Sequence, residues 1–402
     1  AGTPIKLKIR KPGQETPVDV SLNREEIKTK AVQYAGILPN TTTGYIKLIS
    51  FTENCSGEVK EAFLNLKTKG CNSLVLDLRG NLGGLLLEAV NIVNFFTDKG
   101  QEVVFTKGKI PEWDKTYLSV NNPIDLQIPL VVLVDENSAS ASEIVSGALQ
   151  DLDRAVIVGK RTYGKGLVQQ TKDLVYNAKI KVTVAKYYIP SGRCVQALDY
   201  SNKDEEGRVD KVPDSLITAF KTRGGRIVYD GAGVMPDVKT EEEKYSNIAI
   251  SLLSKFHIFN YATDYVLKHP QIDPVASFKL SEEDYNGFLR YLEGKDYDYQ
   301  SKSERELEEL KKNAQEEMYF EGISAEYLAL ENKMKQNKKS DVHKHKDEIR
   351  KILEEEIVSR YYFQTGRIEF SLRNDTDLSK GIEILKDETK IKTILTRIEK
   401  PE

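Results

Sequence analysis

Between residues 44 and 160, short apolar runs of strand length alternate with amphipathic stretches of helix length. The apolar runs predict strands at Tyr45–Phe51, Ser73–Leu78, Leu130–Asp135 and Ala155–Gly159. The amphipathic stretches predict helices at Gly57–Lys69, Leu85–Phe96 and Ser142–Leu149. This alternation is typical of an α/β core in which helices cover a sheet.

The pattern changes on both sides of this core. Upstream, two alternating segments, Ile5–Ile9 and Val18–Leu22, flank a turn and predict a hairpin that ends a small β domain. Downstream, the pattern predicts strands at 167–172, 179–189 and 226–229, with a polar loop at 201–207. From Glu241 onward, Lys, Glu, Leu and Tyr recur at helical spacing, as at Ile349, Ile352, Leu353 and Ile357. We therefore predict three parts: residues 1–30, 31–240 and 241–402.

The composition narrows the class of protein. The 402 residues are 39% hydrophobic and 30% charged, with a net charge of −3, so no basic field favours nucleic acid. No apolar stretch is long enough to span a bilayer. Because the chain starts at Ala1 and opens with a strand, we expect the natural protein to begin further upstream. The three cysteines, Cys55, Cys71 and Cys194, have no metal-ligand spacing, so we expect small buried residues and no metal site.

The histidines exclude the commonest catalytic arrangements. All four, His257, His269, His343 and His345, lie in the helical part, where we expect them at the surface. A Ser-His-Asp triad, an HExxH zinc site and most catalytic cysteine arrangements are therefore excluded from the core.

A serine-rich run, Asn137–Glu143, lies between an apolar strand and an amphipathic helix. Such a turn exposes a hydroxyl, while the free N–H groups and dipole of the helix stabilise developing negative charge. Serines in this position also cap helices without any catalytic role. The run is therefore a candidate nucleophile site with a structural alternative.

A lysine between glycines favours the catalytic interpretation. Gly164-Lys165-Gly166 follows a predicted strand, and the glycines allow close backbone packing around the amine. A lysine acts as a general base only where apolar surroundings lower its pKa from about 10.4 toward neutrality. Gln169 could hold the amine without adding charge.

Gly159–Lys165 also fits the phosphate-loop pattern G-x-x-x-x-G-K. However, Gly166 replaces the hydroxyl that would bind Mg²⁺, and the following residues, 167–171, predict a strand instead of a helix. This pattern does not support a nucleotide site.

The ordered motifs resemble the C-terminal processing, or tail-specific, peptidases, which use a Ser-Lys dyad. The motifs are Asp77–Gly84, Ser138–Glu143 and Thr162–Gly166 with Gln169, followed by Tyr188–Arg193 and Gly233–Asp237. The resemblance spans residues 1–238. It implies Ser140 as nucleophile, Lys165 as base and Gln169 as the residue that orients the lysine. It also implies an oxyanion hole formed by the Ala141 N–H and the Gly83-Gly84 turn, with Gly84 favoured.

The resemblance further implies a fold: a peptidase core like those of crotonase and Clp proteases, preceded by the last strands of a PDZ domain. An extended peptide could add to a sheet edge, for which Lys179–Tyr188 is a candidate, with Val182, Val184 and Tyr188 as substrate-binding residues. The expected partners are protein or peptide substrates with accessible C-termini, with no cofactor, metal or nucleic acid. The C-terminal helices are a candidate surface for a homo-oligomer. The resemblance implies export to the periplasm or cell envelope. The alternative is a catalytically idle peptide-binding or scaffold protein.

Overall fold

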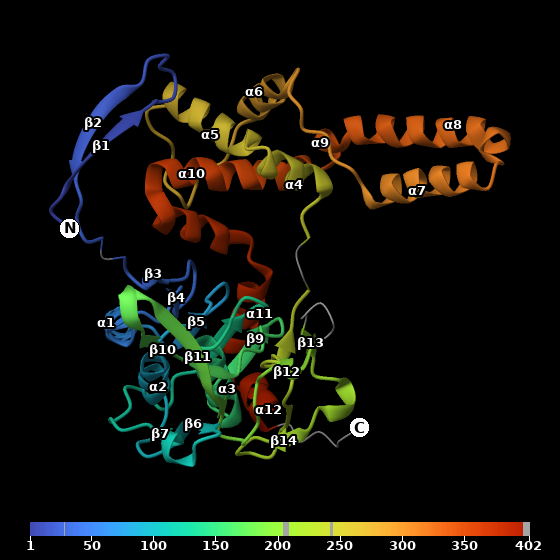
Figure 1. The fold of residues 1–402 in the computed structure, drawn as a ribbon. Coiled ribbons are helices and arrows are strands. Elements are labelled where there is room, and N and C mark those ends of the chain that lie inside the picture. Colours follow the sequence, from blue (N-terminus) through green and yellow to red (C-terminus); the bar gives the residue numbers. More distant parts are fainter. Residues whose placement is uncertain (28, 204–208, 242–243, 397–402) are drawn as a thin grey trace. The chain divides into compact units, whose positions relative to one another are not determined.

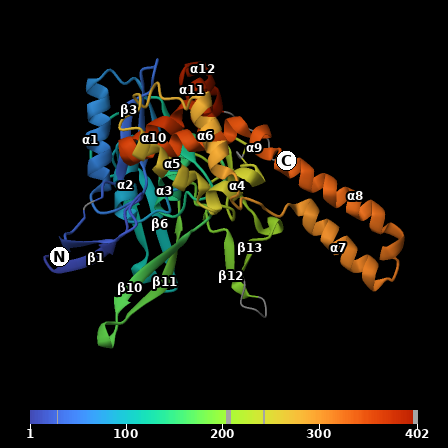
Figure 2. The ribbon, with the colours of Figure 1, turned by 90° about the horizontal axis from the view of Figure 1, so that it is seen from above.

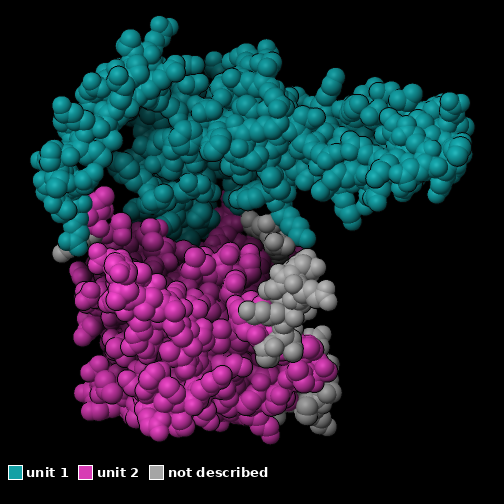
Figure 3. Space-filling view, in the orientation of Figure 1, with its two compact units in different colours: residues 1–26, 243–373 teal, residues 27–242, 374–402 magenta. Residues whose placement is uncertain are grey.

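The chain forms two compact units in a computed structural model that describes residues 1–27, 29–203, 209–241 and 244–396. One unit contains residues 27–242 and 374–402, and the other contains residues 1–26 and 243–373 (Figures 1 and 3). The first, called the α/β unit here, carries the serine and lysine motifs. The second is the helical unit.

A six-stranded sheet forms the centre of the α/β unit, in the order β16-β9-β8-β5-β4-β3. Its strands are β3 (Val32–Ile37), β4 (Thr43–Leu48), β5 (Ser73–Asp77), β8 (Leu130–Val134), β9 (Val156–Gly159) and β16 (Val238–Lys239). Neighbouring strands are parallel except β3, which runs antiparallel to β4. The predicted strands of the core are therefore present, whereas β3 and β16 were not predicted.

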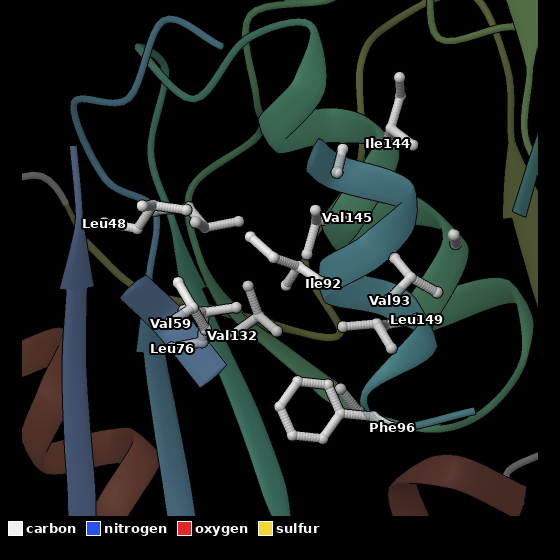
Figure 4. Packing of buried hydrophobic residues seen from close by; sticks show 14 of the residues in the cluster. Leu48, Val59, Leu76, Ile92, Val93, Phe96, Val132, Ile144, Val145 and Leu149 are labelled. Atoms are coloured by element: carbon white, nitrogen blue, oxygen red, sulfur yellow. The ribbon is translucent and has the colours of Figure 1, made fainter. Parts of the chain in front are cut away.

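Helices cover both faces of this sheet. On one face, Leu76 and Val132 pack with side chains of α1 (Cys55–Thr68), α2 (Leu86–Asn94) and α3 (Ala141–Asp151), as Figure 4 shows. On the other face lies α11 (Thr376–Leu385), where an added Cβ at Gly381 would lie 3.2 Å from Val131. Because both faces are covered, β5 and β8 are buried at every position, which explains their continuous apolar sequences. A further helix, α12 (Glu388–Thr396), follows α11 in the same unit.

A second sheet of the α/β unit has the order β10-β11-β6-β7. Its strands are β6 (Glu102–Gly108), β7 (Lys115–Leu118), β10 (Leu167–Asp173) and β11 (Lys179–Tyr188). Figure 2 shows β10 and β11 as a long hairpin. Two short pairs complete the unit: β12 (Leu198–Lys203) with β13 (Val209–Lys211), and β14 (Ala219–Lys221) with β15 (Ile227–Tyr229). The predicted polar loop falls partly on β12 and partly on residues 204–208, outside the described residues.

The helical unit confirms the predicted change of pattern after Glu241. Its helices are α4 (Asn247–Ser254), α5 (His257–Lys268), α6 (Glu282–Leu292), α7 (Lys302–Glu316), α8 (Phe320–Lys339), α9 (Asp341–Lys344) and α10 (Lys346–Ser371). Helices α4, α5, α6, α9 and α10 contribute to a separate core that includes Ile349, Leu353 and Ile357. No described helix has the length and apolar character needed to cross a membrane.

The N-terminal hairpin consists of β1 (Pro4–Ile9) and β2 (Val18–Asn23), close to the predicted segments. An isolated hairpin is marginally stable, so the sequence suggests that it packs on the α/β core. That expectation is wrong, because residues 1–26 group with the helical unit. At the hairpin turn, a Cβ on Gly13 would lie 3.6 Å from Leu267 of α5.

Candidate active site

Ser140 is the residue immediately before α3, at the carboxyl end of the sheet. Its backbone has φ 57° and ψ −112°, whereas an ordinary helix-capping serine is extended. A non-glycine residue with such dihedral angles is strained by about 1–3 kcal/mol and persists only where the surrounding structure enforces it. The sequence expectation of a sharp strand-to-helix turn is therefore confirmed, and its strain is centred on Ser140.

The neighbouring serines have structural roles. The buried Ser138 hydroxyl donates to the Leu78 carbonyl at 2.9 Å, and the buried Ser142 hydroxyl donates to the Asn81 carbonyl at 2.8 Å. Both bonds hold the serine run against the turn that follows β5. Ser140 is half-buried and lines a cavity. The geometry therefore distinguishes the candidate nucleophile from its two neighbours.

The Gly83-Gly84 turn packs directly on the loop that carries Ser140. Gly83 has φ 96°, and a Cβ there would lie 2.8 Å from the Ser140 Cβ; Gly84 has φ 150°, and a Cβ there would lie 2.3 Å from the Phe51 carbonyl oxygen. Glycine is required at both positions, because any side chain would force the loops apart. The Gly83 N–H donates to Asn81 Oδ1 at 2.9 Å.

Two backbone N–H groups beside Ser140 remain available. Among the described residues, no hydrogen-bond partner occurs for the N–H of Gly84 or for that of Ala141 at the start of α3. Both residues line the cavity that contains Ser140. Since Gly83 already donates to Asn81, Gly84 and Ala141 are the better candidates for oxyanion donors, and the sequence preference for Gly84 stays a prediction.

Lys165 lies on the loop between β9 and β10, and its flanking glycines pack tightly. A Cβ on Gly164 would lie 2.3 Å from the Ala197 Cβ, and one on Gly166 would lie 2.8 Å from the Gln196 backbone nitrogen. The Gly166 N–H donates to Gln196 Oε1 at 2.8 Å. The predicted close packing around the lysine is therefore present.

One cavity of about 430 Å³ brings the predicted dyad and oxyanion residues together. Its lining includes Ser140, Lys165, Gln169, Gly83, Gly84 and Ala141. Apolar side chains form part of the wall, among them Leu82, Leu85, Ile144 and Leu167. Segments separated by more than 80 residues along the chain thus converge on one site.

The three predicted substrate-binding residues do not line this cavity. Val182 is exposed, Val184 lines a different hollow beside Trp113, and the Tyr188 ring stacks on Phe105 at 5.2 Å. The residues of β11 that line the cavity are Lys181 and Tyr187, and β10 contributes Leu167, Val168 and Gln169. β11 has strand partners on both sides near its end, because β6 pairs with residues 185–188.

Glu143 is a central residue whose role the sequence did not reveal. Its fully buried carboxylate accepts four hydrogen bonds. The donors are the Ser140 N–H (2.8 Å), the Lys165 N–H (2.8 Å), the Gly164 N–H (2.7 Å) and the Thr162 hydroxyl (2.6 Å). Burial raises the pKa of Glu143, and these hydrogen bonds oppose the rise. The spacing of Ser140 and Glu143 matches a helix-capping box, which was the only available sequence signal. One side chain thus joins the serine loop to the lysine loop.

Tyr187, on β11, makes the complementary connection. Its buried hydroxyl lies 3.1 Å from the Ser140 carbonyl oxygen and 2.5 Å from that of Lys165. Burial raises its pKa well above the usual value, with a further contribution from Glu143, so it remains a neutral donor. Glu143 therefore binds the N–H groups of Ser140 and Lys165, while Tyr187 binds their carbonyl groups.

The structure also tests the sequence predictions for the phosphate-loop pattern, the cysteines and the histidines. β10 follows Gly166 directly, so no helix is present to cap a phosphate, as the sequence indicated. Cys55 and Cys71 are buried and Cys194 is partly buried. The surface assignment is wrong for His257, which is buried and bonds the Asp296 carbonyl through Nε2.

Comparisons with known proteins confirm the resemblance that the motifs suggested. Residues 42–201 match the model of "Peptidase family S41". Residues 248–385 match a model described as "Probable PDZ-protease, C-terminal helical domain". The first match covers Ser140 and Lys165, so the candidate site lies within a region similar to serine peptidases.

Individual relatives are similar over the same region. The chain is 39% identical over 202 residues to the carboxy-terminal-processing protease of Bartonella bacilliformis, covering 49% of this chain and 46% of that protein. It is 39% identical over 190 residues to carboxyl-terminal-processing peptidase 1, chloroplastic, of Arabidopsis thaliana, covering 47% and 36%. A solved photosystem II D1 C-terminal processing protease is 30% identical, with a TM-score of 0.39 and coverage of 60% and 56%. The chain spans less than half the length of these two curated relatives.

Proposed function

We propose that this chain is a serine endopeptidase in which Ser140 is the nucleophile and Lys165 the general base. The observation that carries the proposal is one cavity lined by Ser140, Lys165 and two backbone N–H groups that have no hydrogen-bond partner among the described residues. The strained backbone of Ser140 supports it, because such strain is concentrated at functional sites.

The reaction follows from these groups. Lys165 Nζ, as the proposed general base, accepts the Ser140 hydroxyl proton while Oγ bonds to the substrate carbonyl carbon, and the carbonyl oxygen becomes an oxyanion. The Gly84 and Ala141 N–H groups stabilise that charge. The C–N bond then breaks, the leaving amine takes the proton from Lys165, and an ester to Ser140 remains. Water, deprotonated by Lys165, hydrolyses the ester and restores Ser140. Gln169 orients the lysine.

The substrate is proposed to be an extended peptide. β10 is the edge strand of its sheet, and its first residues, Leu167, Val168 and Gln169, line the cavity. An edge strand offers unpaired backbone groups that can bind a peptide without regard to its sequence. We therefore propose that the substrate pairs with the edge of β10. We also propose that an apolar side chain of the substrate packs against the wall formed by Leu85 and Ile144. The names of the relatives favour cleavage near C-termini.

The resemblance of the motifs also suggests roles for the α/β unit as a whole, the N-terminal hairpin and the C-terminal helices. We propose that the α/β unit is a crotonase- or Clp-like core and that the β1–β2 hairpin is the end of a PDZ domain. The description of the helical-domain model as part of a PDZ-protease agrees with this assignment. The exposed apolar side chains of α7 and α8, such as Leu310 and Leu328, are the proposed contact surface of a homo-oligomer.

We also propose that the full-length protein is exported to the periplasm or cell envelope. The resemblance of the sequence motifs to the C-terminal processing peptidases supports this proposal. Fractionation with a cytosolic marker tests it directly: we expect the full-length protein in the envelope or periplasmic fraction, and recovery with the cytosolic marker contradicts export.

The test of function is incubation of the chain with an unstructured protein, followed by mass spectrometry of the fragments. We expect new C-termini after apolar residues, and a fluorophosphonate probe should attach to Ser140. A chain that neither cleaves nor reacts with the probe would instead be an idle peptide-binding protein. The same digest fixes the cleavage preference.

A further inference from the structure

Helix α11, near the C-terminal end of the sequence, binds the side chain of Arg79, the residue that begins the Gly80–Gly84 turn. Asp375 caps α11 by accepting the Leu378 N–H at 2.9 Å. The same carboxylate receives both terminal nitrogens of Arg79, with Nη1–Oδ1 at 2.9 Å and Nη2–Oδ2 at 2.5 Å. Asp377 accepts from Arg79 Nη1 at 3.1 Å. This is a bidentate ion pair between residues 296 positions apart.

The pair is largely removed from solvent. The side chains of Arg79, Asp375 and Asp377 are 18%, 12% and 6% exposed. Arg79 also bonds Asp77, which is 1% exposed. Burial disfavours the charged guanidinium, yet Asp77 and Asp375 raise the pKa of Arg79. Charge-assisted, bidentate bonds in such surroundings fix orientation as well as charge.

Arg79 begins the turn that ends in Gly83 and Gly84. The Arg79 carbonyl accepts a bond from Lys47 Nζ at 2.8 Å, and the next N–H, that of Gly80, donates to Asp135 at 2.9 Å. Asn81 then bonds the Leu48 carbonyl at 2.9 Å and the Gly83 N–H. Hydrogen bonds therefore hold the turn in place along its length, from Arg79, which binds Asp375, to Gly83, which lies beside Ser140.

We propose that Asp375 is a positioning residue of the active site, which acts through Arg79 on the Gly80–Gly84 turn. This inference rests on the proposed peptidase function. The segment Asn374–Thr396 is then part of the catalytic unit, although the whole helical unit precedes it along the chain. The helical-domain match extends to residue 385, whereas the structure groups residues from 374 with the α/β unit.

The expected consequence is specific to the chemical step. An oxyanion donor acts only when it points at the developing charge, and a displacement of about 1 Å can cost about 10²-fold in rate. Ground-state binding of the peptide depends on β10 and the apolar wall, which Asp375 does not touch. Loss of the Asp375 charge should therefore lower kcat and leave KM nearly unchanged.

The test compares Asp375→Asn with Glu383→Gln in the full chain. Asparagine keeps the helix cap and removes the charge. Glu383, on the same helix, forms exposed ion pairs with Lys380 and Lys390 and serves as the matched control. We expect Asp375→Asn to lower kcat by about 10- to 100-fold with KM changed less than twofold, and Glu383→Gln to leave both unchanged.

Hydrogen exchange of residues 79–85 gives a readout independent of activity. We expect faster exchange there in Asp375→Asn than in the control, with exchange in α1 unchanged. If the unaltered chain cleaves no peptide, the proposed function fails while this measurement still tests the Asp375 contact. Unchanged kcat and unchanged exchange in a folded Asp375→Asn overturn the inference. If that variant does not fold, the same readouts in Asp377→Asn decide, since it removes the second carboxylate on Arg79.

Discussion

Replacing Ser140 by alanine is expected to lower peptide cleavage by about 10³-fold or more and to abolish covalent labelling. The same loss of cleavage is expected for Lys165→Ala, because a nucleophile and its base act as one unit. Lys165→Arg should also be inactive, since a guanidinium does not release its proton near neutral pH. Cleavage of a fluorogenic peptide, with circular dichroism to verify folding, provides the measurement.

Two variants serve as controls for the dyad. Ser142→Ala removes a buried hydroxyl that bonds the Asn81 carbonyl, so it should reduce stability by about 1 kcal/mol while Ser140 still reacts with the probe. Lys69→Arg changes an exposed lysine just after α1 and should leave cleavage unchanged. Substantial activity in folded Ser140→Ala or Lys165→Arg would refute the dyad assignment.

Glu143→Gln is expected to impair both folding and activity. Four donors converge on the carboxylate, two on each oxygen, and an amide offers only one acceptor oxygen, so two of the four donors would face its NH₂ group. Each unsatisfied buried group costs about 1–3 kcal/mol, which predicts a loss of about 2–5 kcal/mol in the free energy of unfolding. Urea denaturation measures the loss, and peptide cleavage at a temperature where the variant is folded should fall by about 10²-fold or more.

The matched control is Glu136→Gln, which alters an exposed carboxylate just before the serine run. It should change the free energy of unfolding by less than about 0.5 kcal/mol. If Glu143→Gln is as stable and as active as this control, the two loops do not depend on Glu143. A stable but inactive Glu143→Gln variant would show that Glu143 positions the active-site loops more than it stabilises the fold.

Several features of the site were predictable because their causes are local. The strand-to-helix turn at Ser140 follows from an apolar run, a serine-rich turn and an amphipathic stretch that adjoin in the sequence. The glycines at 164 and 166 indicated close backbone packing, and the structure shows that packing at both. The absence of histidine from residues 1–240 excluded a classical triad before any fold was known.

Other features depend on which segments meet in space. The sequence predicted a substrate edge on β11, whereas the structure pairs residues 185–188 of β11 with β6 and makes β10 an edge strand whose first residues lie beside Ser140. Strand order in a sheet is decided by packing and crossover connections between segments far apart in the chain, which hydrophobic periodicity within each strand does not encode. The N-terminal hairpin illustrates the same limit, since its existence was predictable and its packing partner was not.

The sequence by itself therefore determined the α/β and helical parts, the candidate catalytic side chains and the turns that carry them, since each arises from neighbouring residues. Only the tertiary structure decided that Glu143 and Tyr187 join the serine and lysine loops, and that Asp375 reaches Arg79. The contacts of Glu143 with Lys165, of Tyr187 with Ser140 and of Asp375 with Arg79 join residues 22, 47 and 296 positions apart. A buried charge is stable only with its partners, and those partners are supplied by the folded chain and not by its nearest neighbours in sequence.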